Sequence, residues 1–154
     1  PMDRLLVQAT PRHIVKAHIY LDELTTVTFP MFADFSRLER DFYRFGGELD
    51  LEGLKAERRV PGIDKRLMLI LPTDRGHFEA PVVGREDEAA KMVGVSSEIV
   101  RERIRVLLRR DTVGRTGVYL KYRLKPDESF EEAFRRLAIQ DPGIRRMLHE
   151  RGYL

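Results

Sequence analysis

The sequence contains no cysteine and no tryptophan among its 154 residues. The missing thiol excludes disulfides, thiolate catalysis and cysteine-based zinc sites. Asparagine is absent as well, and glutamine occurs only at Gln8 and Gln140. Because heat damages amides and cysteine readily, this composition is typical of a protein from a hot-living host.

Long apolar runs are also missing. No stretch approaches the roughly 20 residues that a membrane-spanning helix needs, and Leu5-Leu6-Val7 is too short for the apolar region of a signal peptide. We therefore expect a cytoplasmic protein without membrane contact. The length and the 42% hydrophobic content fit one domain, or two small ones that share a core.

Residues suited to metal binding or catalysis are sparse. Only His13 and His18 lie close together among the four histidines, and no acidic residue stands beside them at metal-ligand spacing. Asp50, Glu52 and Lys55 are clustered as in a metal-dependent nuclease, but the sequence offers no nucleophile with its base and no phosphate-cradling glycine loop. We expect no enzymatic activity, no metal and no cofactor.

Positive charge is concentrated in one segment. The whole chain carries a net charge of +3, whereas residues 99–125 hold nine cations against Glu102 and Asp111. This segment therefore carries +7, and the remainder carries −4. A basic segment on a mildly acidic body is the pattern of a localised phosphate-binding face. The alternative interpretation is a solvated, arginine-rich helix.

The first half of the chain predicts a small antiparallel sheet covered by one helix. Residues 15–21 alternate apolar and polar side chains, and residues 25–29 repeat the pattern, which predicts a β-hairpin. A helix is predicted over 31–45, ended by Gly46-Gly47. Its apolar stripe consists of Met31, Phe35, Leu38, Phe42 and Phe45. Beyond it we expect a short strand at 48–51, a buried central strand at 66–71 and a loop over 72–83.

The last part of the chain is predicted to be helical. Ser129 and Glu132 have the spacing of a capping box, which marks the start of a helix. Asp141-Pro142 predicts the start of a second helix, with the aspartate as cap and the proline where no N–H is needed. We expect these helices either to pack on the core or to form the seam of a homodimer.

Two helices joined by a tight turn are predicted between residues 89 and 110. Residues 89–93 suit a short helix, and Gly94 provides the turn because its backbone adopts angles that a side chain penalises. Ser96 or Ser97 caps the second helix, which is expected to continue to Arg110. Its inward residues are expected to be Val100, Ile104, Leu107 and Leu108.

This segment resembles the helix-turn-helix superfamily in the spacing of Ala90, Gly94, Val100 and Ile104. The resemblance implies that the second helix lies in the major groove of DNA. Arg101 and Arg105 would then each read a guanine through two hydrogen bonds, and Glu98 or Glu102 would accept one from cytosine. In the alternative, Glu98 pairs with Arg101 and Glu102 with Arg105 in solvent, which leaves little attraction for phosphate.

The next residues extend the resemblance to winged helices. A short strand is expected at 111–113, a tight turn at 114–117 and a returning strand at 118–124. In winged helices the tip of this hairpin touches the DNA backbone or the minor groove, a role that would fall to Arg115. The expected DNA-binding residues are Ser96, Ser97, Glu98, Arg101, Glu102, Arg105, Arg109, Arg115, Lys121 and Arg123.

The sequence thus predicts an α+β protein in three parts: a subdomain over 2–80, a winged helix-turn-helix-like unit over 84–125, and C-terminal helices over 126–154. The expected function is binding of double-stranded DNA in the regulation of transcription or replication. The alternative is a protein-binding adaptor or inhibitor, such as a phage or plasmid protein acting on polymerase or a replication protein, with the edge of the 15–29 hairpin pairing with a partner. A third option is single-strand binding, with bases stacked on Tyr119 and Phe78.

Overall fold

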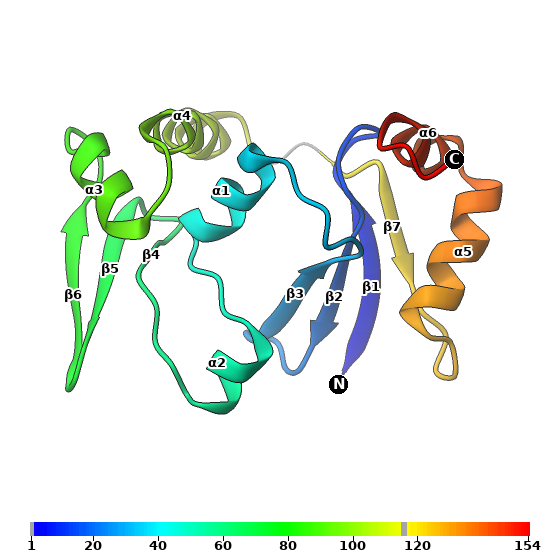
Figure 1. The fold of residues 1–154 in the computed structure, drawn as a ribbon, viewed down its shortest axis with the longest axis horizontal. Helices are drawn as coiled ribbons and strands as arrows, with labels where there is room; N and C mark the ends of the chain where they lie inside the picture. Colours follow the sequence, from blue (N-terminus) through cyan, green and yellow to red (C-terminus); the bar gives the residue numbers. More distant parts are fainter. Residues whose placement is uncertain (1, 115–116) are drawn as a thin grey trace. The chain divides into compact units, whose positions relative to one another are not determined.

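The computed structural model describes residues 2–114 and 117–154, which form six helices and two antiparallel sheets (Figure 1). The chain is therefore α+β, as the sequence predicts. It divides into two compact units: unit 1 combines Pro1–Asp34 with Thr116–Leu154, and unit 2 is the continuous segment Phe35–Arg115. These boundaries differ from the three expected parts because the two ends of the chain share one sheet.

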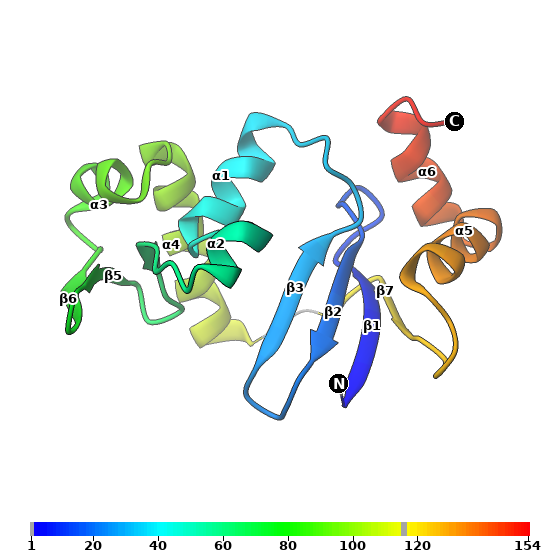
Figure 2. The ribbon, with the colours of Figure 1, turned by 60° about the horizontal axis from the view of Figure 1, so that its bottom comes forward.

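Unit 1 contains a four-stranded sheet in the order β3-β2-β1-β7, which Figure 2 shows side by side. Its strands are β1 (Asp3–Gln8), β2 (Lys16–Tyr20), β3 (Thr26–Pro30) and β7 (Leu120–Arg123). The predicted hairpin is confirmed by the pairing of β2 with β3. Strand β1 was not predicted, and it joins the two ends of the chain by placing Leu6 opposite Tyr122.

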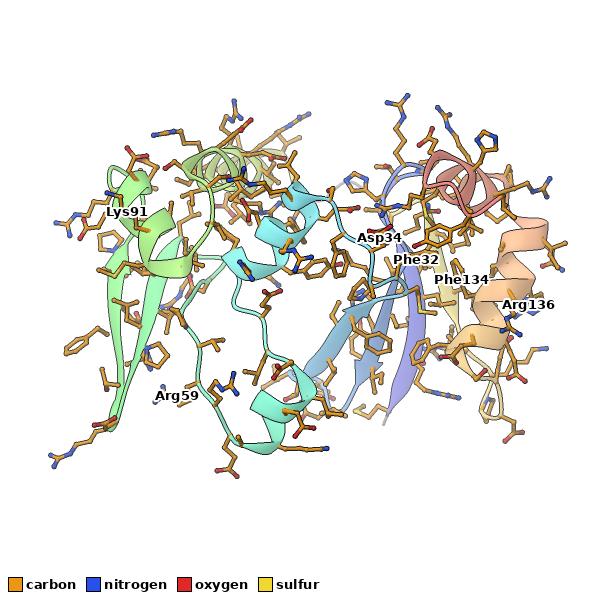
Figure 3. All side chains as sticks on the ribbon, viewed as in Figure 1. Phe32, Asp34, Arg59, Lys91, Phe134 and Arg136 are labelled. Atoms are coloured by element: carbon orange, nitrogen blue, oxygen red, sulfur yellow. The ribbon has the colours of Figure 1, made fainter. Side chains whose placement is uncertain are left out.

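Two C-terminal helices, α5 (Phe130–Gln140) and α6 (Pro142–Glu150), pack on one face of this sheet (Figures 1 and 2). The predicted capping box is present, since Ser129 and Glu132 each accept a hydrogen bond from the other's backbone N–H. Buried Leu6, Ala17 and Ile144 belong to the core of this unit. Figure 3 labels Phe32 and Phe134, whose rings meet edge to face with centroids 5.4 Å apart.

The helix predicted over 31–45 is not part of the unit that contains β2 and β3. It is α1 (Arg37–Phe45) and belongs to unit 2. The helix begins at Arg37 because Ser36 and Glu39 form a capping box at its start. Its predicted apolar stripe is largely wrong: Phe45 is buried, but Leu38 is 54% exposed.

The remaining elements of unit 2 are α2 (Leu51–Lys55), β4 (Gly62–Ile63), β5 (Met68–Thr73), β6 (Gly76–Pro81), α3 (Glu86–Val93) and α4 (Ser97–Val113). The predicted central strand at 66–71 is confirmed as β5, which lies between β4 and β6. Two predictions are wrong. Residues 48–51 form no strand, because Asp50 caps α2 by accepting from the N–H of Gly53. The expected loop at 72–83 contains β6, whose mostly exposed side chains give no apolar alternation.

Candidate nucleic-acid interface

Helices α3 and α4 are joined by the turn that the sequence predicts. Gly94 lies in the left-handed region with φ of 79°, and its N–H donates to the carbonyl of Ala90. Only glycine adopts this conformation without steric cost. The side chain of Ser96 then accepts from the N–H of Ile99 at 3.3 Å, which caps the start of α4. The turn and the cap together fix the direction in which α4 leaves α3.

One face of α4 is buried in the core of unit 2. Val100 is fully buried, and Ile104 and Leu107 are 8% exposed. They share a cluster with Ala90 of α3 and Phe45 of α1. The three helices α1, α3 and α4 therefore form one helical layer. Leu108, expected to point inward, is 49% exposed and lies on the outer side of α4.

A buried carboxylate that the sequence did not reveal ties α1 to the turn. Asp41 is 8% exposed, and its Oδ2 accepts from the backbone N–H of Ser96 at 3.1 Å. A carboxylate inside a core is stable only where it is hydrogen-bonded. No sequence signal identifies this bond, because the two residues meet only when α1 and α4 pack.

The side chain of Arg103 is half-buried and packs against α1. Its guanidinium lies 4.9 Å from the ring centroid of Phe42 and 6.0 Å from that of Phe45. Burial lowers the pKa of Arg103, and the charge of Arg110 acts in the same direction. The side chain therefore covers the aromatic surface of α1 through cation–π contacts. It does not belong to the face that α4 presents to solvent.

The opposite face of α4 carries three exposed arginines, Arg101, Arg105 and Arg109. Their spacing of four residues places them along one side of the helix. Neither Glu98 nor Glu102 forms an ion pair with an arginine of α4 within the described part of the chain. The alternative interpretation, pairing of charges along this helix, is therefore not what the structure contains, and Arg105 and Arg109 have no ion-pair partner among the described residues.

Arg101 instead pairs with Asp87 in the first turn of α3. Its guanidinium donates to Oδ1 of Asp87 at 2.7 Å, and both side chains are largely exposed. A hydrogen bond from the Ser97 side chain, together with the charge of Arg101, lowers the pKa of Asp87. Asp87 therefore holds Ser97 and Arg101, two of the residues near the start of α4 that are expected to contact DNA. The sequence carries no signal for this contact, because residues 14 positions apart meet only through the crossing of α3 and α4.

The predicted wing is wrong. Residues 111–113, expected to form its first strand, continue α4 as helix. The second strand, β7, pairs instead with β1 in the unit 1 sheet, where Leu6 lies opposite Tyr122. Arg115, the expected wing tip, lies outside the described residues. No hairpin follows α4 within the residues that the structure describes.

Nine of the ten expected DNA-binding residues lie in the described part of the chain, and they divide between the two units. The structure brings seven together at the start and along the outer side of α4: Ser96, Ser97, Glu98, Arg101, Glu102, Arg105 and Arg109. Lys121 and Arg123 are exposed on β7 of unit 1, where Arg123 pairs with Asp3 at 2.7 Å.

Residues 2–114 and 117–154 contain no group of three or more histidine and acidic side chains placed to hold a metal ion. Over the same ranges, no helix combines the length and apolar character required to cross a bilayer.

Comparison with known proteins gives no relative. No family model, no curated protein and no solved structure matches this chain. The assignment of function therefore depends on the geometry and charge of the chain itself.

Proposed function

We propose that this protein binds double-stranded DNA through α4 and regulates transcription or replication. One observation carries the proposal: Arg101, Arg105 and Arg109 form an exposed row on a helix whose other face is fixed in a core. The helix follows a glycine turn and a serine cap, an arrangement similar to that of helix-turn-helix proteins. Such proteins insert the second helix of the pair into the major groove.

The dimensions of α4 fit this role. The Cα atoms of Arg101 and Arg109 lie about 12 Å apart along the helix axis at 1.5 Å per residue. An α-helix fits within the major groove, where arginine recognises guanine through two hydrogen bonds. Arg105 is best placed to read a base because it lies at the middle of the row. Arg109 and Ser97 are assigned to phosphates, and Glu98 or Glu102 to cytosine.

The proposal is tested by selecting duplexes from a random pool and measuring their affinity as a function of salt. Arg105→Ala should relax the sequence preference, with a loss of about 1–3 kcal/mol on the selected duplex and less on others. Arg109→Ala should weaken all duplexes alike and reduce the slope of log K against log salt by about one. Arg135→Ala is a matched control, since it removes an exposed arginine from α5 of unit 1.

Two outcomes would contradict the proposal. Equal loss on every duplex from Arg105→Ala would remove its base-reading role. If a variant with alanine at Arg101, Arg105 and Arg109 binds duplexes with unchanged affinity, α4 does not contact DNA.

A second candidate is a protein-binding adaptor, favoured by the exposed edge of the unit 1 sheet. Strand β3 lies at the end of the strand order, and its residues 26–29 are all exposed. Val27 is 41% exposed and Leu24, in the turn before β3, is 97% exposed. A partner strand would add to this edge through backbone hydrogen bonds. The test measures binding of a purified polymerase or replication protein. This candidate is favoured if Val27→Lys abolishes that binding while the variant with alanine at Arg101, Arg105 and Arg109 retains it.

A further inference from the structure

The sheet of unit 1 has a second face that the function proposed for α4 does not use. Residues of one face pack against α5 and α6, whereas their neighbours in each strand point to the opposite side. We call this side the outer face of the unit 1 sheet. Its members are Asp3, Leu5, Val7, Lys16, His18, Tyr20, Thr26, Thr28, Lys121 and Arg123.

Two aromatic rings lie side by side on the outer face. The rings of His18 and Tyr20 are stacked at an interplanar angle of 25°, with centroids 6.3 Å apart. The hydroxyl of Thr28 lies 3.0 Å from Nδ1 of His18 and holds that ring from the neighbouring strand. Burial, and then the charge of Lys16, lower the pKa of His18, so the ring is neutral at pH 7. A neutral aromatic pair held on a sheet is a surface on which nucleobases stack.

Three cations lie on the same face of the sheet as this pair. Lys16 and Lys121 both lie opposite Val7, one on each side of β1. Two strand spacings separate them, or about 10 Å. Arg123 lies opposite Leu5, two residues along β7 from Lys121. Cations at such spacings follow a phosphate backbone while the bases contact the rings.

The negative charges of this region are mostly at its margin. Asp3 is the one carboxylate among the outer-face residues, and it is neutralised by Arg123 at 2.7 Å. Asp22 and Glu23 border one end, in the turn between β2 and β3. A hollow of about 430 Å³ lies between, lined by Leu5, Tyr20, Lys121 and Arg123 together with these acids. The hollow is lined by Lys121 and Arg123 against Asp3, Asp22 and Glu23, so attraction for an anionic polymer comes from Lys121 and the neighbouring Lys16 and not from a net positive charge. The buried side chain of Leu5 favours a flat apolar group above it.

We propose that the outer face of the unit 1 sheet binds single-stranded DNA, with bases stacked on Tyr20 and His18 and phosphates held by Lys16, Lys121 and Arg123. The choice of DNA over RNA rests on the proposed function of α4, since a protein that binds a duplex meets its separated strands. The site uses other residues than α4 does, and the two proposals are tested separately.

The test measures the affinity of the full chain for a fluorescein-labelled dT20 oligonucleotide by anisotropy. Tyr20→Leu keeps the apolar bulk but removes the ring, and it should weaken binding about fivefold or more, the lower end of the range for loss of one stacked base. Lys121→Ala should reduce the slope of log K against log salt by about 0.7. Arg135→Ala, on the helical side of the unit, is the matched control and should change neither.

Thermal unfolding of each variant establishes that it is folded. If Tyr20→Leu is unfolded, the exposed Lys121→Ala and Arg123→Ala carry the test alone. Unchanged dT20 affinity in folded variants at these positions overturns the proposal. Tighter binding of rU20 than of dT20 overturns the assignment to DNA, and equal competition by polyglutamate overturns the assignment to nucleic acid.

Duplex binding distinguishes this proposal from the one for α4. A chain that binds dT20 but no duplex contradicts the role of α4 and supports the outer face. A chain that binds duplexes through α4 but not dT20 contradicts only the outer face. The triple alanine variant of α4 should retain dT20 binding within about twofold.

Discussion

The two units of this protein differ in how their chain segments come together. Unit 2 is one continuous segment, and its helix pair is specified by neighbours in the sequence such as Gly94 and Ser96. Unit 1 closes only when β1 from the start of the chain pairs with β7 near its end, with Leu6 opposite Tyr122. Local patterns therefore suffice for the helix pair, whereas the unit 1 sheet depends on contacts between distant segments.

The largest effect on this comparison is expected from removing one buried isoleucine from each unit. Ile144 is fully buried in unit 1, and Ile104 is 8% exposed in unit 2. Ile144→Ala and Ile104→Ala should each lower the free energy of unfolding of their own unit by about 2–5 kcal/mol, through lost burial and the cavity left behind. Hydrogen exchange followed by mass spectrometry measures the two units separately.

Ile144→Ala should accelerate exchange in β1, β2 and β7, and Ile104→Ala should accelerate it in α1, α3 and α4. Equal acceleration in both units from either variant would show that the chain unfolds as one cooperative body. The two units would then be distinct in structure but would not unfold independently.

The same contrast explains what the sequence could predict. Helix starts were predicted where a cap lies next to its helix, as at Ser96 and Ser129. The sequence predicts no strand at β1 and places β7 in a wing, because nothing in the residues of either strand indicates with which strand it pairs. The arginine row of α4 followed from helical spacing alone. Its contact with Asp87 did not, since the crossing of two helices brings these residues together.

The next largest effect is expected at the two helix caps. Ser129→Ala removes the capping box of α5, and Ser96→Ala removes the bond to the N–H of Ile99. Each substitution should lower the stability of its unit by about 1 kcal/mol, measured by the same exchange experiment. Ser129→Asp and Ser96→Asp keep a capping oxygen and should lose much less. A loss from the aspartate variants as large as from alanine would assign the effect to packing instead.

A smaller effect is expected from releasing Arg101. Asp87→Asn removes a negative charge beside the proposed DNA and frees the guanidinium, so duplex affinity should rise about two- to fivefold at low salt, the range of an exposed ion pair. Glu88→Gln removes the same charge from the same turn of α3 without touching Arg101 and should do less. In an Arg101→Ala background the difference between the two should vanish. Weaker duplex binding by Asp87→Asn would instead make Asp87 a positioning residue for Arg101.

The smallest expected effect is the contribution of Glu128 to the pH dependence of unit 1. Glu128 accepts hydrogen bonds from Arg136, labelled in Figure 3, and from Tyr122, and these bonds lower its pKa to about 2. Because this folded-state pKa is depressed, the stabilisation is fully present above the unfolded pKa near 4.5 and is lost as the pH falls toward 2. In Glu128→Gln the free energy of unfolding of unit 1, measured by urea unfolding, should change less with pH across this window. An unchanged pH profile in this variant would assign the acid sensitivity to other carboxylates.

The most direct test of the central claim is to map the contact surface of a selected duplex on the chain by amide chemical shifts, which its mass of 18.0 kDa permits. The account predicts that the largest changes lie at residues 96–109, in the turn and along α4, and that they diminish as salt rises. Changes concentrated on β3, or absent from α4, would contradict it.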